Sequence, residues 1–311
     1  MTAAIIVLYY PDLACLARLL KSLTHEVDEV IVIDNTLNLA KDVANYVDNP
    51  DSHVQYIPLG KNAGIAAAQN VGIIKAASKG HSHILLLDQD SVLLPGTVAK
   101  LLAAERELQR SGTQIAAICP RVIDRRTGDR PAAVRYHTLL ASEFQPTASC
   151  EQPIASENLI ASGSLIRIDT LQSIGLMRED LFIEYVDTEW VRRALSAGYQ
   201  SYCVPDARMM HSFGDSSVKL FGKHFYLYSN DRYYYKLRNE VFLSRLITMG
   251  WQWRAYALSR IPYHFILYSA LSKSRLRASC LLLKAIWDGI TGRLGPLPQA
   301  PAYTKPLCSP P

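Results

Sequence analysis

The N-terminal third of the chain alternates short apolar runs with amphipathic segments, and no other feature limits the fold as strongly. The runs expected to be strands are residues 4–9, 29–33, 54–57, 84–87 and 115–118, and the segments expected to be helices are 12–22, 64–78 and 95–109. Strands separated by helices are joined by crossovers, which makes neighbouring strands parallel and covers both faces of the sheet. The sequence therefore predicts an α/β fold with a mostly parallel, Rossmann-like sheet.

Polar residues follow two of these runs where each strand would end: Asp34 and Asn35 after one, Asp88 and Asp90 after another. Ligands of such sheets bind at the carboxyl ends of the strands. Side chains two positions apart in an extended segment point the same way, so Asp88 and Asp90 can share a hard cation such as Mg²⁺ or Mn²⁺. That ion would neutralise a departing diphosphate. A polar turn after a strand is the alternative interpretation.

Small residues crowd the start of the helix expected at residues 64–78, and Asn62, Gly64 and Asn70 lie among them. Small side chains let a ligand approach the backbone, and a helix N-terminus presents N–H donors to an anion. The segment therefore predicts a place where an anionic ligand can approach the backbone. An Asn-capped helix that packs closely on a neighbouring strand would explain the same pattern.

Asp187 stands where the helix expected at residues 187–197 begins. Aspartate is favoured there as a cap, because its carboxylate accepts N–H donors and suits the helix dipole. The functional alternative is a general base that takes a proton from an acceptor hydroxyl, with Glu189 as the second candidate. His211 follows a strand-like run and is a candidate third metal ligand, although a lone histidine is more often structural.

The rest of the chain is expected to complete a catalytic part and add an appendage. A loop-rich crossing is expected at residues 121–157, further strands at 159–168, 199–204 and 209–213, and helices from about 231 to 290. The expected boundaries are a catalytic domain at 1–215, a basic, aromatic helical extension at 216–295, and a Pro-rich disordered tail at 296–311. The crossing is expected to carry acceptor specificity.

Charge is divided unequally between the two parts. Residues 1–215 carry 19 Lys and Arg against 25 Asp and Glu, whereas residues 216–311 carry 14 against 3. A basic segment rich in Trp and Tyr predicts attachment to an anionic membrane surface, and a helical cap with solvated bases is the alternative. No apolar run is long enough to span a bilayer, so we expect a cytoplasmic protein that lies peripherally on the inner membrane.

The six cysteines show no Cys-x-x-Cys spacing. A chain of this length can bury a core without covalent cross-links, so we expect reduced thiols and neither a disulfide framework nor a zinc site. No recognised nucleic-acid-binding module occurs, so nucleic acid is not an expected partner.

Seven motifs in a fixed order carry a resemblance to a known family. They are Tyr-Tyr-Pro-Asp at 9–12, Val-Ile-Asp-Asn at 32–35, the segment 62–72, Leu-Leu-Asp-Gln-Asp-Ser at 86–91, Ala-Ser-Gly at 161–163, the segment 182–190, and His211. In this order they resemble glycosyltransferase family 2, and more narrowly its bacterial rhamnosyltransferases, which use dTDP-L-rhamnose. The resemblance covers about residues 3–240. Galactofuranosyltransferases share much of the pattern.

The resemblance implies a GT-A fold, a divalent metal ion and inversion at the anomeric carbon. It implies that Asp187 is the catalytic base. It implies a metal site made by Asp88, Asp90 and His211, and a nucleotide-sugar site made by Tyr9, Asp34, Asn62, Gly64, Asn70, Asp88, Gln89, Ser162, Gly163 and Arg238. Tyr234 and Asn239 fall in a segment that resembles one near the donor or acceptor of related enzymes. Val186 departs from the pattern, because related transferases often have an acidic residue just before the base.

The predicted function is therefore an inverting, metal-dependent transfer of L-rhamnose from dTDP-L-rhamnose to a hydroxyl of a cell-surface polysaccharide or glycolipid. A UDP-sugar transferase of the galactofuranosyl type and a non-catalytic nucleotide-sugar-binding protein remain alternatives. A nucleotidyltransferase is disfavoured, because it needs a Gly-rich basic loop after the first strand. That position is occupied by Tyr9, Tyr10, Pro11 and Asp12.

Overall fold

A ten-stranded mixed sheet forms the centre of the molecule. The computed structural model describes residues 1–37, 43, 47, 53–124, 128–129, 133–145, 152–211, 216–220, 223–272 and 274–298. The strands follow the order β10-β12-β6-β11-β4-β1-β2-β3, with β5 paired to β12 and β7 to β6. Their bounds are β1 Thr2–Leu8, β2 Glu29–Asp34, β3 Val54–Pro58, β4 His83–Asp88, β5 Val92–Leu93, β6 Ile115–Asp124, β7 Gly128–Asp129, β10 Ile154–Ser156, β11 Leu165–Arg167 and β12 Gln200–His211.

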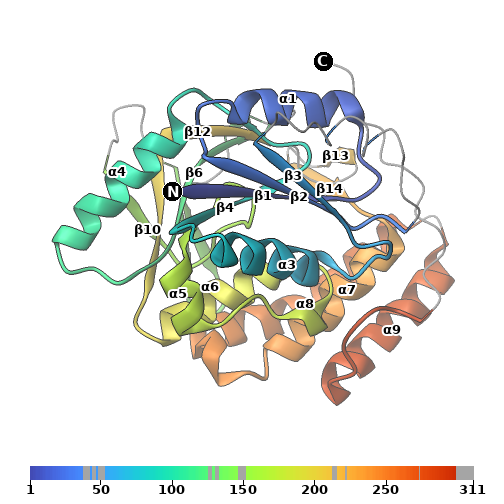
Figure 1. Cartoon of the computed structure of the whole chain (residues 1–311). Coiled ribbons are helices and arrows are strands. Elements are labelled where there is room, and N and C mark those ends of the chain that lie inside the picture. Colours follow the sequence, from blue (N-terminus) through green and yellow to red (C-terminus); the bar gives the residue numbers. More distant parts are fainter. Residues whose placement is uncertain are drawn as a thin grey trace.

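Helices cover both faces of this sheet (Figure 1). Their bounds are α1 Leu13–Leu23, α3 Ile65–Ser78, α4 Thr97–Arg110, α5 Ile168–Ile174, α6 Val186–Ser196, α7 Asn230–Leu243, α8 Trp251–Leu271 and α9 Arg275–Thr291, with 3-10 turns at Glu179–Leu181 and Ile247–Met249. Successive residues of a strand point to opposite faces. Ile5 therefore packs in the core under α3, α5 and α6, whereas Ile6 packs in the core under α1 and α4. This arrangement confirms the predicted fold class.

Antiparallel β11 interrupts the parallel strands in the middle of the sheet, while the short strands β5, β7 and β10 add antiparallel pairs to β12 and β6. β11 lies between β4 and β6 and runs antiparallel to both, while β12 pairs parallel to β6. The strand expected at residues 159–168 is therefore wrong at its start, because only Leu165–Arg167 are extended. Gly163 has a φ of 88°, a left-handed conformation that ends the strand pattern. The two strands expected at 199–204 and 209–213 are joined in one strand, β12, which ends at His211; residues 212–213 lie outside the described residues.

Two hairpins stand beside the main sheet: β8 Ala133–Tyr136 with β9 Ala141–Phe144, and β13 Ser216–Leu220 with β14 Lys223–Leu227. The first hairpin lies within the crossing expected to be loop-rich. The part of the tail at 299–311 lies outside the described residues.

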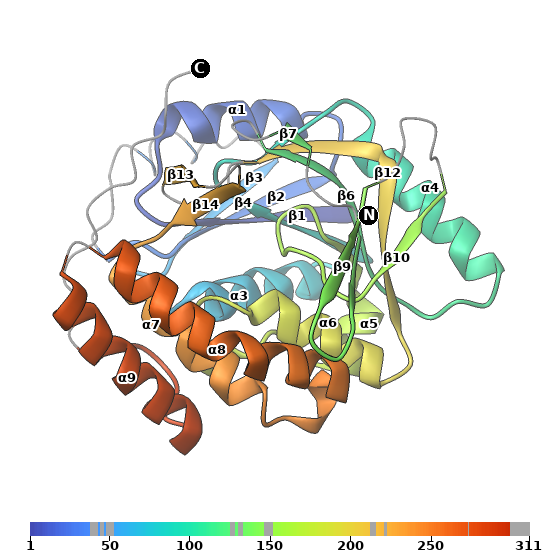
Figure 2. The same cartoon turned by 180° about the vertical axis from the view of Figure 1, so that it is seen from behind.

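The C-terminal helices pack against the catalytic part and share its core (Figure 2). Trp253 and Ala257 of α8 belong to the same buried cluster as Trp190 of α6. Tyr233 of α7 stacks on Tyr268 of α8 with ring centroids 4.3 Å apart, in a second cluster of aromatic residues. Within the described part of the chain, no helix is both long and apolar enough to cross a bilayer.

One expectation for the cysteines is wrong. Cys15 on α1 is disulfide-bonded, whereas Cys119, Cys203 and Cys280 are free. Cys150 and Cys308 lie outside the described residues. The spacing of cysteines along a sequence does not report their separation in the fold, so the absence of a Cys-x-x-Cys motif could not exclude this bond.

Candidate active site

The carboxyl ends of β4 and β12 lie at the same edge of the sheet, because both strands run parallel within it. The chain leaves β4 at Asp88 and crosses to β12, where β5 pairs with Met209 and Met210. This crossing brings Asp90 to His211: Oδ1 of Asp90 lies 3.1 Å from Nδ1 of His211, and Oδ2 of Asp88 lies 3.7 Å from Nε2. The structure thus brings together all three residues expected to hold a metal.

Burial and charge act in opposite directions on these side chains. Burial raises the pKa of Asp88 above its ordinary value, although the charges of His211 and Arg232 oppose the rise. Burial alone would lower the pKa of His211, but its hydrogen bond to Asp90 and the charges of Asp90 and Asp88 raise it overall. The charges of His211 and Arg232 therefore favour the ionised form of Asp88, against the larger effect of its burial.

The ligand types of this cluster, two carboxylates and an imidazole, suit a divalent cation, although their present arrangement does not converge on one ion. Mg²⁺ holds its ligands at about 2.1 Å in octahedral geometry, so adjacent ligand atoms lie about 3 Å apart. Asp90 Oδ1 and His211 Nδ1 have that separation. Asp88, however, faces the other ring nitrogen, and the described residues contain no group of three His, Cys, Asp or Glu arranged as a metal site. A side-chain rotation of Asp88 or His211 is needed to bring the three onto one ion.

Ser162, Gly163 and Gln89 support the end of β4 from within the protein. Ser162 Oγ accepts a hydrogen bond from the Asp88 N–H at 3.1 Å and lies 2.6 Å from Ser91 Oγ. Gly163 donates its N–H to Leu86 O, and a Cβ at Gly163 would come within 2.9 Å of Pro120. Gln89 accepts the Tyr9 N–H at 2.9 Å. These contacts fix the backbone that carries Asp88 and Asp90.

Asp187 lies in the first turn of α6. Its Oδ1 accepts the Thr188 N–H at 2.7 Å, and its Oδ2 accepts the Ala161 N–H at 3.2 Å. Burial raises the pKa of Asp187 to about 6; these two N–H donors oppose the rise, and the charges of Glu184 and Asp88 add to it. The Asp187 carboxylate can therefore take up or release a proton at a pH close to neutral, and its charge interacts with that of Asp88.

The loop of residues 176–185 leads into Asp187 and is strained. Phe182, Glu184 and Tyr185 all have positive φ values, of 66°, 66° and 61°. Non-glycine residues rarely adopt this conformation, and they keep it only where surrounding contacts enforce it. Three such residues within four positions therefore need an unusually well-braced loop.

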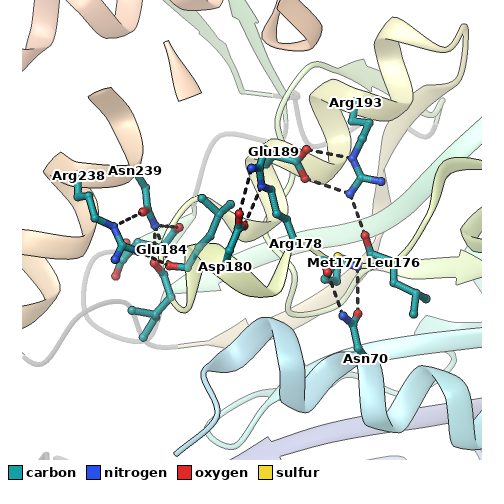
Figure 3. Close-up of polar contacts among 12 residues, drawn as sticks. Asn70, Leu176, Met177, Arg178, Asp180, Glu184, Glu189, Arg193, Arg238 and Asn239 are labelled. Carbon is teal, nitrogen blue, oxygen red and sulfur yellow. Dashed lines mark hydrogen bonds and ion pairs between the residues drawn. The ribbon is translucent and has the colours of Figure 1, made fainter. Parts of the chain in front are cut away.

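Arg238 and Asn239 of α7 supply much of that bracing (Figure 3). Asn239 is fully buried, and its Nδ2 donates to the carbonyls of Leu181, Ile183 and Glu184 at 3.1, 2.8 and 2.9 Å. Arg238 donates to Leu181 O at 2.9 Å and to Gly295 O at 2.6 Å. Arg238 therefore braces the loop through these carbonyls, and its expected contact with the nucleotide-sugar stays a prediction.

Two more expected site residues also hold this loop. Asn70 of α3 donates to Met177 O at 2.9 Å and accepts the Met177 N–H at 3.0 Å (Figure 3). A Cβ at Gly64 would lie 2.6 Å from Phe182 O, so glycine is required for the close approach of α3 to the loop. Glu189, the second candidate base, is buried and paired with Arg193. The contacts of Asn70 and Glu189 are structural.

The expected nucleobase side of the site is closed by protein contacts. Asp34 is fully buried, and its two oxygens accept the Thr36 N–H at 3.0 Å and the Tyr56 hydroxyl at 2.6 Å. Asn62 Oδ1 accepts from Asn35 Nδ2 at 3.1 Å and interacts with the side chain of Tyr9. Asn62 and Tyr9 therefore meet beside β1, whereas both oxygens of Asp34 already accept hydrogen bonds from the protein.

Arg232 and Lys236 of α7 were not expected from the sequence. Arg232 binds Glu184 Oε1 at 2.6 Å, and its charge opposes the rise in the pKa of Asp88. Lys236 lies 3.9 Å from Glu184, and both cations lie 4.4 Å from the ring centroid of Tyr228. Burial alone would raise the pKa of Glu184, but the two cations lower it. In the sequence, Arg232 and Lys236 are four residues apart near the start of a helix, which places them on one face. The segment around them is generally basic, so this pair did not stand out.

A sheet with two carboxylates and a histidine at its strand ends, and a third carboxylate on a facing helix, is the arrangement of a nucleotide-sugar-dependent glycosyltransferase of the GT-A class. The family model "Glycosyl transferase family 2" matches residues 4–174. The dTDP-rhamnosyl transferase RfbF of Shigella flexneri is 33% identical over 296 residues, which are 94% of this chain and 96% of that protein. The chain belongs to glycosyltransferase family 2, as the sequence motifs indicated.

Solved structures share the fold. GalNAc-T7 with UDP, GalNAc and Mn²⁺ is similar with a TM-score of 0.63 and 18% identity, covering 94% of this chain and 57% of that one. S. aureus TarS with UDP-GlcNAc is similar with a TM-score of 0.56 and 17% identity, covering 94% of this chain and 81% of that one. The chain thus spans little more than half of GalNAc-T7. These similarities establish the GT-A fold.

Proposed function

We propose that this glycosyltransferase is an inverting, metal-dependent rhamnosyltransferase. It moves L-rhamnose from dTDP-L-rhamnose to a hydroxyl of a polysaccharide or glycolipid acceptor, such as a lipopolysaccharide core, an O-antigen or a lipid-linked glycan. The identity to dTDP-rhamnosyl transferase RfbF over nearly all of both chains supports the donor. The observation that carries the mechanism is Asp187, a carboxylate with a pKa of about 6 within electrostatic reach of Asp88.

In this mechanism Asp187 removes the proton of the acceptor hydroxyl as the oxygen attacks the anomeric carbon. The bond from that carbon to the diphosphate oxygen breaks, and dTDP leaves with the electron pair. Attack from the face opposite the leaving group inverts the anomeric configuration, and no covalent sugar–enzyme intermediate forms. The two backbone N–H groups that bind Asp187 keep its carboxylate oriented.

The diphosphate is placed between the strand ends and α7. Asp88, Asp90 and His211 would hold Mg²⁺ or Mn²⁺, which would supply positive charge to the leaving oxygen. Arg232 and Lys236 add positive charge from the opposite side, and Glu184 fixes their position. GalNAc-T7, whose structure contains UDP and Mn²⁺, provides a precedent for a metal in this fold.

The acceptor and the location of the enzyme are linked in this proposal. A lipid-linked or lipopolysaccharide acceptor resides at a membrane, and residues 216–311 carry 14 Lys and Arg against 3 Asp and Glu. A basic, aromatic segment of this kind suits an anionic membrane face. We therefore place the enzyme peripherally on the cytoplasmic side of the inner membrane.

Thermal stabilisation by nucleotides tests the donor site, because a ligand that binds the native state raises the melting temperature. The panel is dTDP, UDP, GDP, CDP and ATP, each with and without Mn²⁺. We expect a Mn²⁺-dependent shift with dTDP that Asp90→Ala abolishes. A shift with UDP alone would transfer the proposal to a uridine-linked sugar such as galactofuranose. No shift with any diphosphate would favour a binding module without this activity.

A further inference from the structure

Helix α9 is apolar on two opposite faces. Its inner face packs on α7 and α8 through Ala278, Leu282 and Ala285, all of them buried. A second set repeats with the same helical spacing of three and four residues, and consists of Leu276, Cys280, Leu283, Trp287 and Ile290. On a helical wheel of 100° per residue the two sets are separated by about 150°, so the second set forms a stripe on the outside of the helix. We call this second set the outer stripe.

The outer stripe is exposed along its whole length. The exposed fractions are 84% for Leu276, 57% for both Leu283 and Trp287, and 51% for Ile290. Both views show α9 as the outermost helix on the side of the molecule opposite α1 (Figures 1 and 2). Exposing aliphatic and indole side chains to water is unfavourable in free energy. A contiguous exposed apolar surface therefore marks a site of interaction.

The charges around the outer stripe identify the partner. From residue 244 to the end of the chain there are nine Lys and Arg and a single acidic residue, Asp288. Asp288 is buried and paired with Lys284, so it exposes no negative charge on α9. Arg275 and Arg277 are exposed at the start of the helix, and Arg293 lies just beyond its end. A partner of the outer stripe must therefore offer an apolar region to the stripe and negative charge to the basic residues around it.

An anionic lipid surface has both properties. An interfacial helix buries Leu, Ile and Trp at the boundary of the acyl chains while its Lys and Arg remain among the headgroups. A second copy of this chain would bring its own basic residues against Arg275 and Arg277, which disfavours pairing through this face. Exposed Trp251, Leu258 and Ile266 on α8 give the neighbouring helix a similar outward character.

We propose that α9 is the membrane-contacting element of this enzyme, with the outer stripe inserted at the lipid boundary and Arg275 and Arg277 on anionic headgroups. The inference rests on the proposed peripheral attachment and assigns it to one face of one helix. It predicts that attachment is lost by substitutions on this face while the donor site is unaffected.

The test is sedimentation of the full chain with vesicles of phosphatidylethanolamine and phosphatidylglycerol, compared with vesicles of phosphatidylcholine alone. We expect binding to the anionic vesicles only, weakened by salt because the charge term is screened. Leu283→Asp with Trp287→Asp should lower the partition coefficient about a hundredfold or more. Arg275→Glu with Arg277→Glu should lower it about thirtyfold or more, from a loss of about fivefold or more at each position.

Matched controls use the same substitutions elsewhere. Ile74→Asp changes a residue of α3 that is also 57% exposed, and Arg106→Glu with Arg110→Glu makes the same change in net charge on α4. Both should bind as the unmodified protein does. A urea midpoint for each variant confirms folding, and the dTDP shift with Mn²⁺ reports the donor site separately, so loss of the proposed activity and loss of lipid binding are distinguishable.

Three results would overturn the inference: equal binding to both kinds of vesicle, no binding to anionic vesicles, or unchanged binding by the Leu283→Asp, Trp287→Asp variant. A dimeric mass by light scattering that this variant converts to the monomer would assign the stripe to self-association instead.

Discussion

Two groups of polar side chains, one at the strand ends and one under the loop 176–185, differ in the partners of their polar atoms. At the strand ends, Asp88 and Asp90 face His211, and burial raises the pKa of Asp88. Under the loop, Arg238 and Asn239 are almost fully buried and donate hydrogen bonds to backbone carbonyls, whereas the side chains of Asp88 and Asp90 are partly exposed. The strand-end group therefore has charge with which a ligand can interact, whereas the loop group uses its hydrogen-bond donors to hold the backbone.

We therefore expect the strand-end group to act in the reaction, and the loop group to hold Asp187 in position. Substituting the strand-end group should remove activity and leave stability unchanged or higher, since a carboxylate with a pKa raised by burial is destabilising in its ionised form. Substituting the loop group should lower stability, and should lower activity only through displacement of Asp187. The predictions below test that division.

The largest effect is expected from Asp88→Asn combined with Asp90→Asn. Removing the carboxylates that face the diphosphate should lower kcat by about three orders of magnitude or more, because electrostatic stabilisation of the leaving group is lost. The urea midpoint should not fall. Asp206→Asn, a change at an exposed ion pair with Lys100, is the control and should leave kcat unchanged. A large fall in stability of the double variant would place these aspartates in the structural group.

Asp187→Asn is expected to lower kcat by about a thousandfold, within the range for loss of a general base. Binding of dTDP with Mn²⁺ should be largely retained, because the proposed mechanism assigns Asp187 to the acceptor and not to the donor. Removing the ionisable group should also raise the unfolding free energy at pH 7, since the folded protein raises the pKa of Asp187. Unchanged turnover in this variant would reject Asp187 as the base.

Asn239→Ala should show the opposite pattern. Three carbonyls lose their donor, so we expect a loss of about 2–3 kcal/mol in the free energy of unfolding. Displacement of the loop should lower kcat by up to about a hundredfold, through misplacement of Asp187. Ser244→Ala is the matched control, because Ser244 is buried in the same helix end and donates one bond, to Val241 O at 2.8 Å. It should cost about 1 kcal/mol and leave kcat unchanged.

Sequence periodicity predicted β1, β2, β3, β4 and β6 and most helices, because these strands are largely apolar runs and the helices carry an apolar face. It did not predict the short strands β5, β7 and β10. It failed at residues 159–164, where an apolar run passes through the turn that holds Ser162 against Asp88. Pairing of β5 with β12, which brings Asp90 to His211, joins segments far apart in sequence. No local pattern reports such a contact.

Motifs identified the strand-end aspartates, His211 and the helix-start aspartate, which the fold gathers in one region. They also assigned ligand contacts to Asn70, Arg238 and Asp34, whose polar atoms are engaged by protein. A motif shows that a residue type is required and does not show whether a ligand or the backbone requires it. Hydrogen-bond partners, visible only in three dimensions, decide that question.

The smallest expected effect is the response of the two groups to pH. Burial raises the pKa of Asp187 to about 6, so the free base is lost as pH falls through that value. kcat/KM should therefore be flat above about pH 7 and fall about tenfold per unit below pH 6.

Because the folded pKa exceeds the unfolded one, this aspartate destabilises the fold increasingly as pH rises from about 4 to 6. Asp187→Asn should remove that change in stability, whereas Asn239→Ala should lower stability by the same amount at each pH, because its amide does not titrate. Urea midpoints from pH 4.5 to 7.5 measure the pH dependence of stability for each variant. Parallel curves for the unmodified protein and Asp187→Asn would show that folding does not raise the pKa of Asp187, and would contradict its assignment to the group with a chemical role.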